Sequence, residues 1–262
     1  MKINPMANAR EHIRLYIDTD LTQGAQIALS REQAHYLRNV LRRSAGDTLG
    51  LFNGRDGEWR ASILDLGKQA GRVELREQIQ PQTTVPDLWL LCAPVKRTRL
   101  EIIAEKAAEL GVREIHPVIT EYTNAPRVNM DRLAAITIEA AEQCGLVSIP
   151  KMQAPEKLHA VLDNWPSERQ ILFCDESGAG GAALARLQAA APDMPWAVLT
   201  GPEGGFSPAE RARLHAMPQS LAVSLGPRIL RADTAAIAAL ALWQSVCGDW
   251  DHGPVALAHQ PV

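Results

Sequence analysis

The chain has 262 residues, of which 46% are hydrophobic and 22% charged, and its formal net charge is −3. These totals predict a globular protein of one large or two modest domains, and the negative charge by itself argues against a general nucleic-acid binder. The charge is uneven, however: residues 1–80 carry 12 Lys and Arg against 10 Asp and Glu, whereas the remainder carries 15 against 20. A mildly basic N-terminal part on an acidic remainder indicates a division of labour.

The cysteines and apolar runs exclude several other classes of protein. The four cysteines form no Cys-x-x-Cys pair and no histidines have metal-ligand spacing, which argues against a disulfide framework and against a zinc site. Residues 1–16 lack the apolar centre of a signal peptide, and the longest apolar run, 235–243, is too short to span a bilayer. We therefore expect a cytoplasmic protein without membrane association and without a metal.

The N-terminal elements predict a small, mostly β unit. Its strand-like runs alternate or concentrate apolar side chains, and Asn53-Gly54 and Asp56-Gly57 supply turn chemistry between two of them. We place a first domain at residues 1–80 on this basis. The strand-like runs cover residues 13–17, 48–53, 59–66 and 72–79.

One helix is predicted within this unit, over residues 31–43, with Ser30 as its N-cap. The helix has an apolar face and a basic face. The basic face either contacts RNA phosphates or is an ordinary solvated surface, and the residue pattern is compatible with both. The apolar face consists of Ala34, Leu37 and Leu41, and the basic face of His35, Arg38 and Arg42.

A linker at residues 81–86 (Pro-Gln-Thr-Thr-Val-Pro) precedes a change of pattern. Leu88 to Val95 is a continuous apolar run, as expected of a strand buried on both faces. The following alternation of strand-like and helical segments predicts an α/β domain with a mostly parallel sheet at residues 87–250. Its strands are expected near 88–95, 114–120, 171–174, 196–200 and 222–225, and its main helices near 100–110, 131–143 and 234–246.

Two glycine-punctuated loops predict the functional site. The first, at residues 198–207, reads Val-Leu-Thr-Gly-Pro-Glu-Gly-Gly-Phe-Ser, and the second, at 223–235, reads Val-Ser-Leu-Gly-Pro-Arg-Ile-Leu-Arg-Ala-Asp-Thr-Ala. Each leads from a strand into a helix, where α/β folds place ligands, and glycine lets the backbone approach a ligand closely. Either loop alone is an ordinary turn, but together they predict one composite small-molecule pocket. Neither matches a nucleotide fingerprint, so backbone groups reading an adenine edge fit better than a phosphate cradle.

Three other segments are each open to two interpretations. Residues 178–181 (Gly-Ala-Gly-Gly) resemble a phosphate loop but lack its lysine, which favours a flexible surface loop. The helix at 234–246 is apolar nearly all round, so it lies either in the core or against a second subunit. Residues 96–99 (Lys-Arg-Thr-Arg) either face RNA or simply begin a helix.

The two loops and several shorter motifs occur together in one recognisable order. With Lys96, they spread from about residue 14 to about residue 247, and they resemble the signatures of the RsmE ribosomal RNA methyltransferases, a SPOUT-class family that uses S-adenosylmethionine. Two positions depart from the pattern, since the family usually has arginine where Leu146 stands and often glutamate where Asp233 stands. The motifs are residues 35–42 (His-Tyr-Leu-Arg-Asn-Val-Leu-Arg), 105–112 (Glu-Lys-Ala-Ala-Glu-Leu-Gly-Val), 139–144 (Glu-Ala-Ala-Glu-Gln-Cys), 199–207 and 225–235.

The resemblance implies a PUA-like β-barrel RNA-binding domain at 1–80 and a SPOUT methyltransferase domain with a deep trefoil knot at 87–250. Knots are rare in proteins, so this expectation depends on the resemblance alone. The resemblance further implies a homodimer that methylates N3 of a uridine in the 16S ribosomal RNA of the small subunit. S-adenosylmethionine would be the cofactor, and no metal is required because the sulfonium already activates the methyl group.

Uracil N3 must lose its proton before it can attack a methyl group, so a base and a nearby cation are expected. Arg231 is the candidate cation, and Glu203 or Asp233 either takes the proton or holds Arg231 in place; alternatively, Arg231 forms a salt bridge that fixes the loop. The expected cofactor-binding residues are Leu199, Thr200, Gly201, Glu203, Gly204, Gly205, Ser224, Leu225, Gly226, Ile229, Leu230, Thr234 and Ala235. The expected RNA-binding residues are Arg14, His35, Arg38, Arg42, Lys96 and Arg97.

Two rival functions remain at this stage. A ribose 2′-O-methyltransferase of the same fold would share the cofactor pocket but would activate a hydroxyl group. A catalytically inactive RNA-binding protein of ribosome assembly would keep the fold and lose the cofactor, although the intact glycine loops argue against it.

Overall fold

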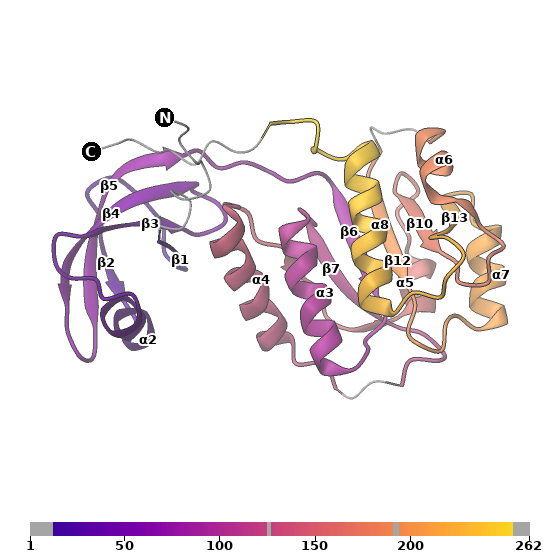
Figure 1. Ribbon diagram of the computed structural model, residues 1–262, viewed down its shortest axis with the longest axis horizontal. Coiled ribbons are helices and arrows are strands. Elements are labelled where there is room, and N and C mark those ends of the chain that lie inside the picture. Colours follow the sequence, from indigo (N-terminus) through magenta and orange to yellow (C-terminus); the bar gives the residue numbers. More distant parts are fainter. Residues whose placement is uncertain (1–12, 125–126, 191–193, 254–262) are drawn as a thin grey trace. The chain divides into compact units, whose positions relative to one another are not determined.

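The computed structural model describes residues 13–124, 127–190 and 194–253 (Figure 1). Within them the chain forms two compact units: the first contains residues 13–84 and 141–148, and the second the described residues of 85–140 and 149–253. None of the helices in this part of the chain has the length and apolar character needed to traverse a bilayer.

The first unit is built on a sheet of five strands in the order β1-β3-β4-β5-β2. β1 pairs with β3 in parallel and every other pair is antiparallel. Leu51, Ile63 and Val73 are among the buried side chains of its core. All four predicted strands are confirmed, whereas β2, with only four residues, was not predicted. The strands are β1 (Arg14–Tyr16), β2 (Gln26–Leu29), β3 (Thr48–Phe52), β4 (Glu58–Leu66) and β5 (Gly71–Gln80).

The helix expected at 31–43 is shorter than predicted. α2 (Arg31–His35) begins after Ser30, which caps it as expected, and continues into a π-helical turn, η1 (Tyr36–Val40). The helix ends there because Arg42 takes a left-handed backbone conformation with φ of 56°. A residue of that conformation after the last turn is a common helix terminator.

Arg14 links residues 141–148 to the sheet within the first unit. Nε of Arg14 lies 2.8 Å from a carboxylate oxygen of Glu58, and both side chains are almost fully buried. The other two guanidinium nitrogens donate to the backbone carbonyls of Ala141, at 2.6 Å, and Leu146, at 2.8 Å. Arg14 therefore holds the unit together. This corrects the expectation that it contacts RNA, since its guanidinium is enclosed by protein.

The second unit is α/β, as predicted, with an eight-stranded parallel sheet among the described residues. Seven strands follow the order β11-β13-β10-β12-β6-β7-β8, and β9 pairs with β7. The very short strands β8, β9 and β11 were not predicted. The strands are β6 (Leu88–Cys92), β7 (Glu114–Ile119), β8 (Lys151–Met152), β9 (Glu156–Lys157), β10 (Gln170–Cys174), β11 (Gly181–Ala182), β12 (Trp196–Thr200) and β13 (Ser220–Ser224).

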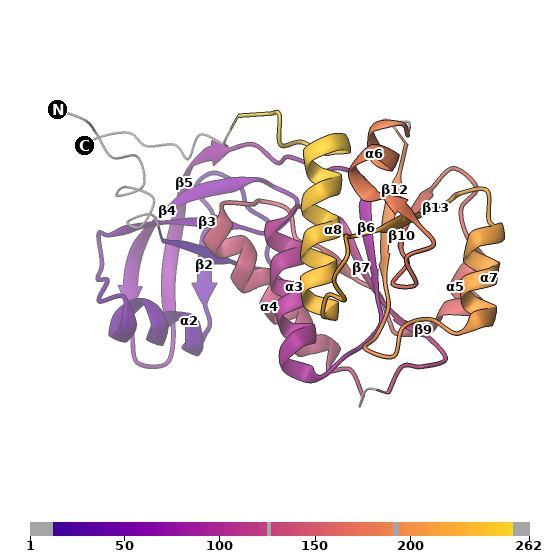
Figure 2. The same ribbon diagram turned by 45° about the vertical axis from the view of Figure 1, so that its right-hand side comes forward.

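Helices cover both faces of this sheet. Successive side chains of a strand point to opposite faces, so a strand that is apolar throughout has an apolar surface on each face to bury. Leu90 and Val198 face one helical layer, whereas Leu91 and Leu199 face the other. Figure 2 shows α3 and α8 side by side over one face and α5 and α7 at the far side of the sheet. The trefoil knot stays a prediction. The helices are α3 (Arg97–Glu109), α4 (Met130–Cys144), α5 (Leu158–Asp163), α6 (Ala183–Gln188), α7 (Pro208–Ala216) and α8 (Ala232–Cys247).

Candidate active site

Both glycine loops begin at the same edge of the sheet in the second unit. β12 and β13 lie on either side of β10 and run parallel to it. The carboxyl ends of parallel strands meet at one edge, which is where α/β folds bind ligands. The segment that follows β10 therefore lies between the two loops.

A cavity of about 440 Å³ opens at this edge, within the size range of small-molecule sites. It lies between the end of β10, the second glycine loop and the start of α8. Six of the expected cofactor-binding residues line it: Ser224, Leu225, Gly226, Ile229, Leu230 and Ala235. Sequence reasoning missed the other lining residues: Cys174, Asp175, Glu176, Gly178, Val223, Pro227 and Arg228.

The backbone at Gly226 explains why glycine stands in the second loop. Its φ is +108°, which side-chain-bearing residues rarely adopt, and apart from its two chain neighbours no described residue has a heavy atom within 4 Å of the position that a Cβ atom would occupy. The side chain of Ile229 is 93% exposed on the same loop, although it is large and apolar. The loop thus presents open backbone and uncovered apolar surface to the cavity.

The first glycine loop contacts protein instead. Leu199 and Thr200 are buried within β12, and a Cβ atom on Gly201 would lie 2.8 Å from the ring of Phe206. The Phe206 ring is 2% exposed and packs edge-on against Phe173. None of the expected residues of this loop, nor Thr234, lines the cavity: these are Leu199, Thr200, Gly201, Glu203, Gly204 and Gly205.

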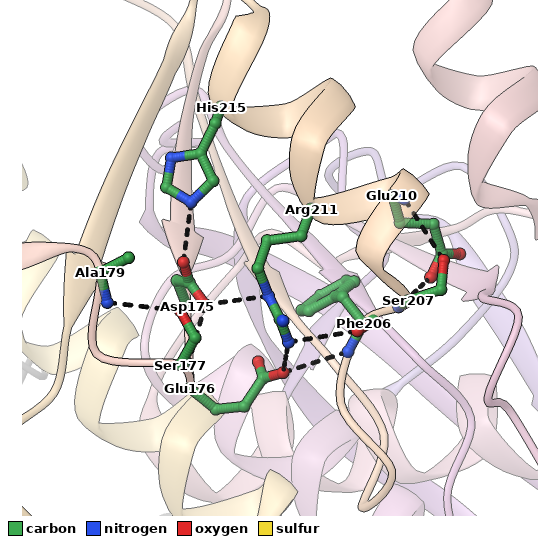
Figure 3. A network of polar contacts seen from close by, with 9 residues as sticks. All are labelled: Asp175, Glu176, Ser177, Ala179, Phe206, Ser207, Glu210, Arg211 and His215. Atoms are coloured by element: carbon green, nitrogen blue, oxygen red, sulfur yellow. Dashed lines mark hydrogen bonds and ion pairs between the residues drawn. The ribbon is translucent and has the colours of Figure 1, made fainter.

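Asp175 and Glu176, directly after β10, connect the cavity to the first loop (Figure 3). The fully buried carboxylate of Asp175 accepts hydrogen bonds from the backbone of Ser177, at 2.9 Å, and from Nε2 of His215, at 2.8 Å. Nε of Arg211 lies 3.4 Å from it. Burial alone raises the pKa of Asp175, but these hydrogen bonds and the arginine charge outweigh burial and hold the pKa below its ordinary value.

Glu176 lines the cavity and also touches the first loop. Its carboxylate accepts hydrogen bonds from Nη2 of Arg211, at 2.5 Å, and from the backbone N–H of Phe206, at 3.2 Å. The side chain also packs against Gly205, whose φ of +68° is easily adopted only by glycine. The two glycine loops are therefore coupled through the end of β10, although only one of them lines the cavity.

The structure places the three candidate catalytic residues on two segments, with Glu203 on the first glycine loop and Arg231 and Asp233 at the start of α8. Arg231 is exposed and occupies the N-cap position of α8. Asp233 receives two hydrogen bonds from Nη1 of Arg99 on α3, at 2.7 and 2.9 Å. Glu203 is exposed on the first loop. Among the described residues, no hydrogen bond or ion pair joins any two of these three candidates. Asp233 thus fixes the first turn of α8 to α3.

The basic face predicted on the helix of the first unit is exposed, in contrast to Arg14. His35, Arg38 and Arg42 all lie on the surface, and the structure pairs none of them with a carboxylate of a described residue. In the second unit, Lys96 occupies the N-cap position of α3 and Arg97 forms an ion pair with Glu101 at 2.8 Å.

Comparison with known proteins identifies the class. A family model described as an RNA methyltransferase domain matches residues 81–244, and a model of the PUA domain of RNA methyltransferases matches residues 29–76. The chain belongs to the RsmE family of RNA methyltransferases. The ribosomal RNA small subunit methyltransferase E of Rickettsia conorii is 34% identical over 229 residues, which cover 87% of this chain and 93% of that protein.

Solved structures agree with this assignment and with the expected SPOUT and PUA-like folds. A Legionella pneumophila protein in complex with its cofactor SAM superimposes with a TM-score of 0.81 at 32% identity, covering 91% of this chain and 99% of that one. The ribosomal RNA small subunit methyltransferase E of Neisseria gonorrhoeae, bound to S-adenosyl methionine, gives a TM-score of 0.79 at 26% identity and covers 92% and 100% of the two chains.

Proposed function

We propose that this protein transfers a methyl group from S-adenosylmethionine to N3 of a uridine in the 16S RNA of the small ribosomal subunit. The observation that carries the proposal is the cavity at the carboxyl end of β10 and β13, in a chain of the RsmE family. The domains proposed for the two tasks are RNA binding at residues 1–80 and methyl transfer at 87–250.

The cavity suits the chemistry of this cofactor. Apolar side chains of the second loop, among them Leu225 and Leu230, suit an adenine ring, and open backbone at Gly226 allows close approach. Asp175 and Glu176 supply negative charge that suits the cofactor's cationic centres. When bound, the cofactor supplies an electrophilic methyl group, so the protein has to provide only orientation and management of the uracil proton.

Arg231 is our candidate for stabilising the uracil anion that forms when N3 loses its proton. Its guanidinium stands at the start of α8, where the helix dipole adds partial positive charge. Asp233 is held by Arg99, so we assign it the positioning of this turn, and Glu203 remains the candidate proton acceptor. Such preorganised charge commonly contributes factors of about 10²–10³ to a rate.

The proposed RNA contacts are the basic face of the first unit and the start of α3. Arg42 supports this role because its side chain is exposed at the residue where the basic helix ends. The remaining candidates are His35, Arg38, Lys96 and Arg97.

We also propose a cytoplasmic homodimer formed through α8. One side of this helix is buried against α3, α6 and the sheet, whereas Ala238, Ala241 and Leu242 are only half-buried. Small side chains of this kind permit a close helix contact. Light scattering of the purified protein tests the dimer, and substitution of Ala241 by Glu should give a monomer.

Nucleoside mass spectrometry of 16S RNA from a strain lacking the protein tests the reaction. We expect N3-methyluridine to disappear and to return when the gene is restored. Loss of a ribose-methylated nucleoside instead would support the 2′-O rival. A complete set of methylated nucleosides, together with no calorimetric heat on addition of S-adenosylmethionine, would support the inactive RNA-binding rival.

The RNA face has a separate test. Reversal of charge at Arg38 and Arg42 to glutamate should weaken binding to small-subunit RNA and reduce the dependence of affinity on salt, since each lost phosphate contact removes about one unit of the salt slope. Unchanged affinity and slope would remove this face from the proposal.

A further inference from the structure

A second hollow in the methyltransferase unit lies where α3 and α4 begin. Its volume is about 290 Å³, and it has no lining residue in common with the cofactor cavity. Three arginines line it: Arg97 from α3, Arg127 from the segment that precedes α4, and Arg132 from the first turn of α4. Glu101 is the only acidic residue among its lining side chains. We call it the arginine hollow.

The single carboxylate is shared between two of the arginines. An oxygen of Glu101 lies 2.8 Å from Nε of Arg97 and 3.8 Å from Nε of Arg132. Arg132 also lies 3.4 Å from a carboxylate oxygen of Glu139, about two turns further along α4. Arg127 has no carboxylate partner among the described residues. The lining therefore carries an excess of positive charge, and the shared carboxylate orients two of the guanidinium groups.

The two helix starts add to this charge. α3 has no acidic residue in its first turn and its N-cap, Lys96, makes no side-chain capping hydrogen bond. Asn129 caps α4 by accepting a hydrogen bond from the backbone N–H of Arg132, at 3.0 Å. Both helices exceed ten residues, so each has partial positive charge at this end, of which Asp131 in the first turn of α4 offsets part.

The hollow is joined to the active-site loop by one turn of helix. Arg99, two residues after Arg97 on α3, forms the ion pair with Asp233 in the first turn of α8. The residue before that turn is Arg231. A group held in the hollow is thereby connected through α3 to the loop that lines the cofactor cavity.

We propose that the arginine hollow binds a phosphodiester group of the substrate RNA, a site that rests on the proposed function for its ligand. Three guanidinium groups around an open hollow suit a tetrahedral anion because each offers forked donors. A phosphate held there fixes the RNA backbone beside the cofactor-binding loop, so that the target base reaches the methyl donor in one orientation.

The test compares the double variant R127Q/R132Q with R213Q. Arg213 is a matched control, because it is an ion-paired, partly exposed arginine of the same unit but lies on α7, in the opposite helical layer. Binding to small subunits from a strain lacking the protein is measured over a range of salt concentrations. We expect the double variant to lose about tenfold in affinity and about one unit of salt slope. R213Q should match the unmodified protein.

Two further measurements keep the proposal falsifiable. R97Q, at a side chain that is 77% exposed, carries little risk of unfolding and should show a smaller loss in the same direction. Calorimetry with S-adenosylmethionine should give unchanged cofactor affinity in all variants, and the rise in KM for subunits should exceed the fall in kcat. Affinity and slope equal to those of R213Q would overturn the proposal, as would parallel loss of cofactor affinity, which indicates a structural role.

Separate outcomes distinguish a free anion from RNA as the ligand of the hollow, and distinguish failure of this proposal from failure of the proposed methyltransferase function. Saturable binding of inorganic phosphate that the double variant lacks, with RNA affinity unchanged, would assign the hollow to a free anion and overturn the RNA site. Failure of the unmodified protein to methylate a uridine would overturn the proposed function, while the comparison of salt slopes would still decide whether the hollow holds RNA.

Discussion

The two glycine loops both begin with a Gly-Pro pair after a strand, but the first is packed against protein and the second is open. The loop after β12 is filled by its own chain, with Phe206 packed over Gly201 and Glu176 against Gly205. The loop after β13 has empty space around Gly226 and an exposed apolar side chain at Ile229. Glycine therefore serves close packing in the first loop and access to a cavity in the second. Large side chains follow the glycine in both loops, but Phe206 packs back onto Gly201 whereas Ile229 stays exposed.

The largest effect is expected at the end of the open loop. Arg231→Ala should lower kcat by about 10²–10³-fold while cofactor affinity stays within about tenfold, because its proposed role is confined to the transition state. Single-turnover methylation of small subunits and calorimetry with S-adenosylmethionine measure the two quantities. Equal losses in both would mean that Arg231 builds the pocket.

A matched pair of alanine substitutions tests the comparison directly. Gly201→Ala should destabilise the fold by about 1–3 kcal/mol, since its Cβ meets the immobile ring of Phe206, with little change in cofactor affinity. Gly226→Ala should mainly reduce cofactor affinity, because its strained backbone, at about 1–3 kcal/mol, lies in the cavity wall. Denaturant unfolding and calorimetry distinguish the two. The reverse pattern would mean that the first loop is the one that grips the cofactor.

The carboxylate between the loops should have the next largest effect. Asp175→Asn should lower the free energy of unfolding by about 2 kcal/mol near neutral pH, because it weakens buried hydrogen bonds to a charged group. The pKa of Asp175 is depressed in the folded state, so its contribution is present above the ordinary carboxyl range and is lost as pH falls through the folded pKa. The unfolding free energy of the variant should accordingly depend less on pH below about 4. Identical acid profiles would contradict this role.

The smallest effect on stability is expected at Glu176, the side chain that connects the two glycine loops. Glu176→Gln removes an exposed charge that bonds to Arg211, so stability should fall by less than about 1 kcal/mol. The backbone N–H of Phe206 should exchange with solvent faster, because its acceptor is weakened. Exchange at that amide serves as the measurement, and the amide of Leu214 on α7 as the internal control. An unchanged rate at Phe206 would show that the first loop holds its shape independently.

The sequence predicted the main strands and helices of both units but not the whole cavity. The long apolar or alternating runs determined β6, β12 and α8, whereas strands of two to four residues such as β2 and β11 are too short to show a period. In the sequence, Asp175 and Glu176 look like an ordinary acidic turn after a strand. Their importance comes from β10 lying between β12 and β13, and strand order is a long-range property that no local pattern carries.

The sequence also did not show which basic residues are exposed. Arg14 looked like the other basic residues of the N-terminal part, but Glu58 and three backbone carbonyls enclose it. Arg38 and Arg42 carry the same charge and lie exposed. Only the three-dimensional neighbours distinguish a structural arginine from one available to a ligand, and a partner 44 residues away in the chain gives no local signal.

The enclosure of Arg14 also affects how the protein emerges during synthesis. Its acceptors on residues 141–148 belong to the same compact unit, but β6, α3 and β7 of the second unit come before them in the chain. The N-terminal unit therefore cannot complete its hydrogen bonds until the nascent chain has been extended past residue 148. A fragment that stops at residue 84 would keep the Arg14–Glu58 ion pair but would leave the Arg14 guanidinium without its backbone carbonyl acceptors, so we expect this fragment to be less stable than the same unit in the full chain.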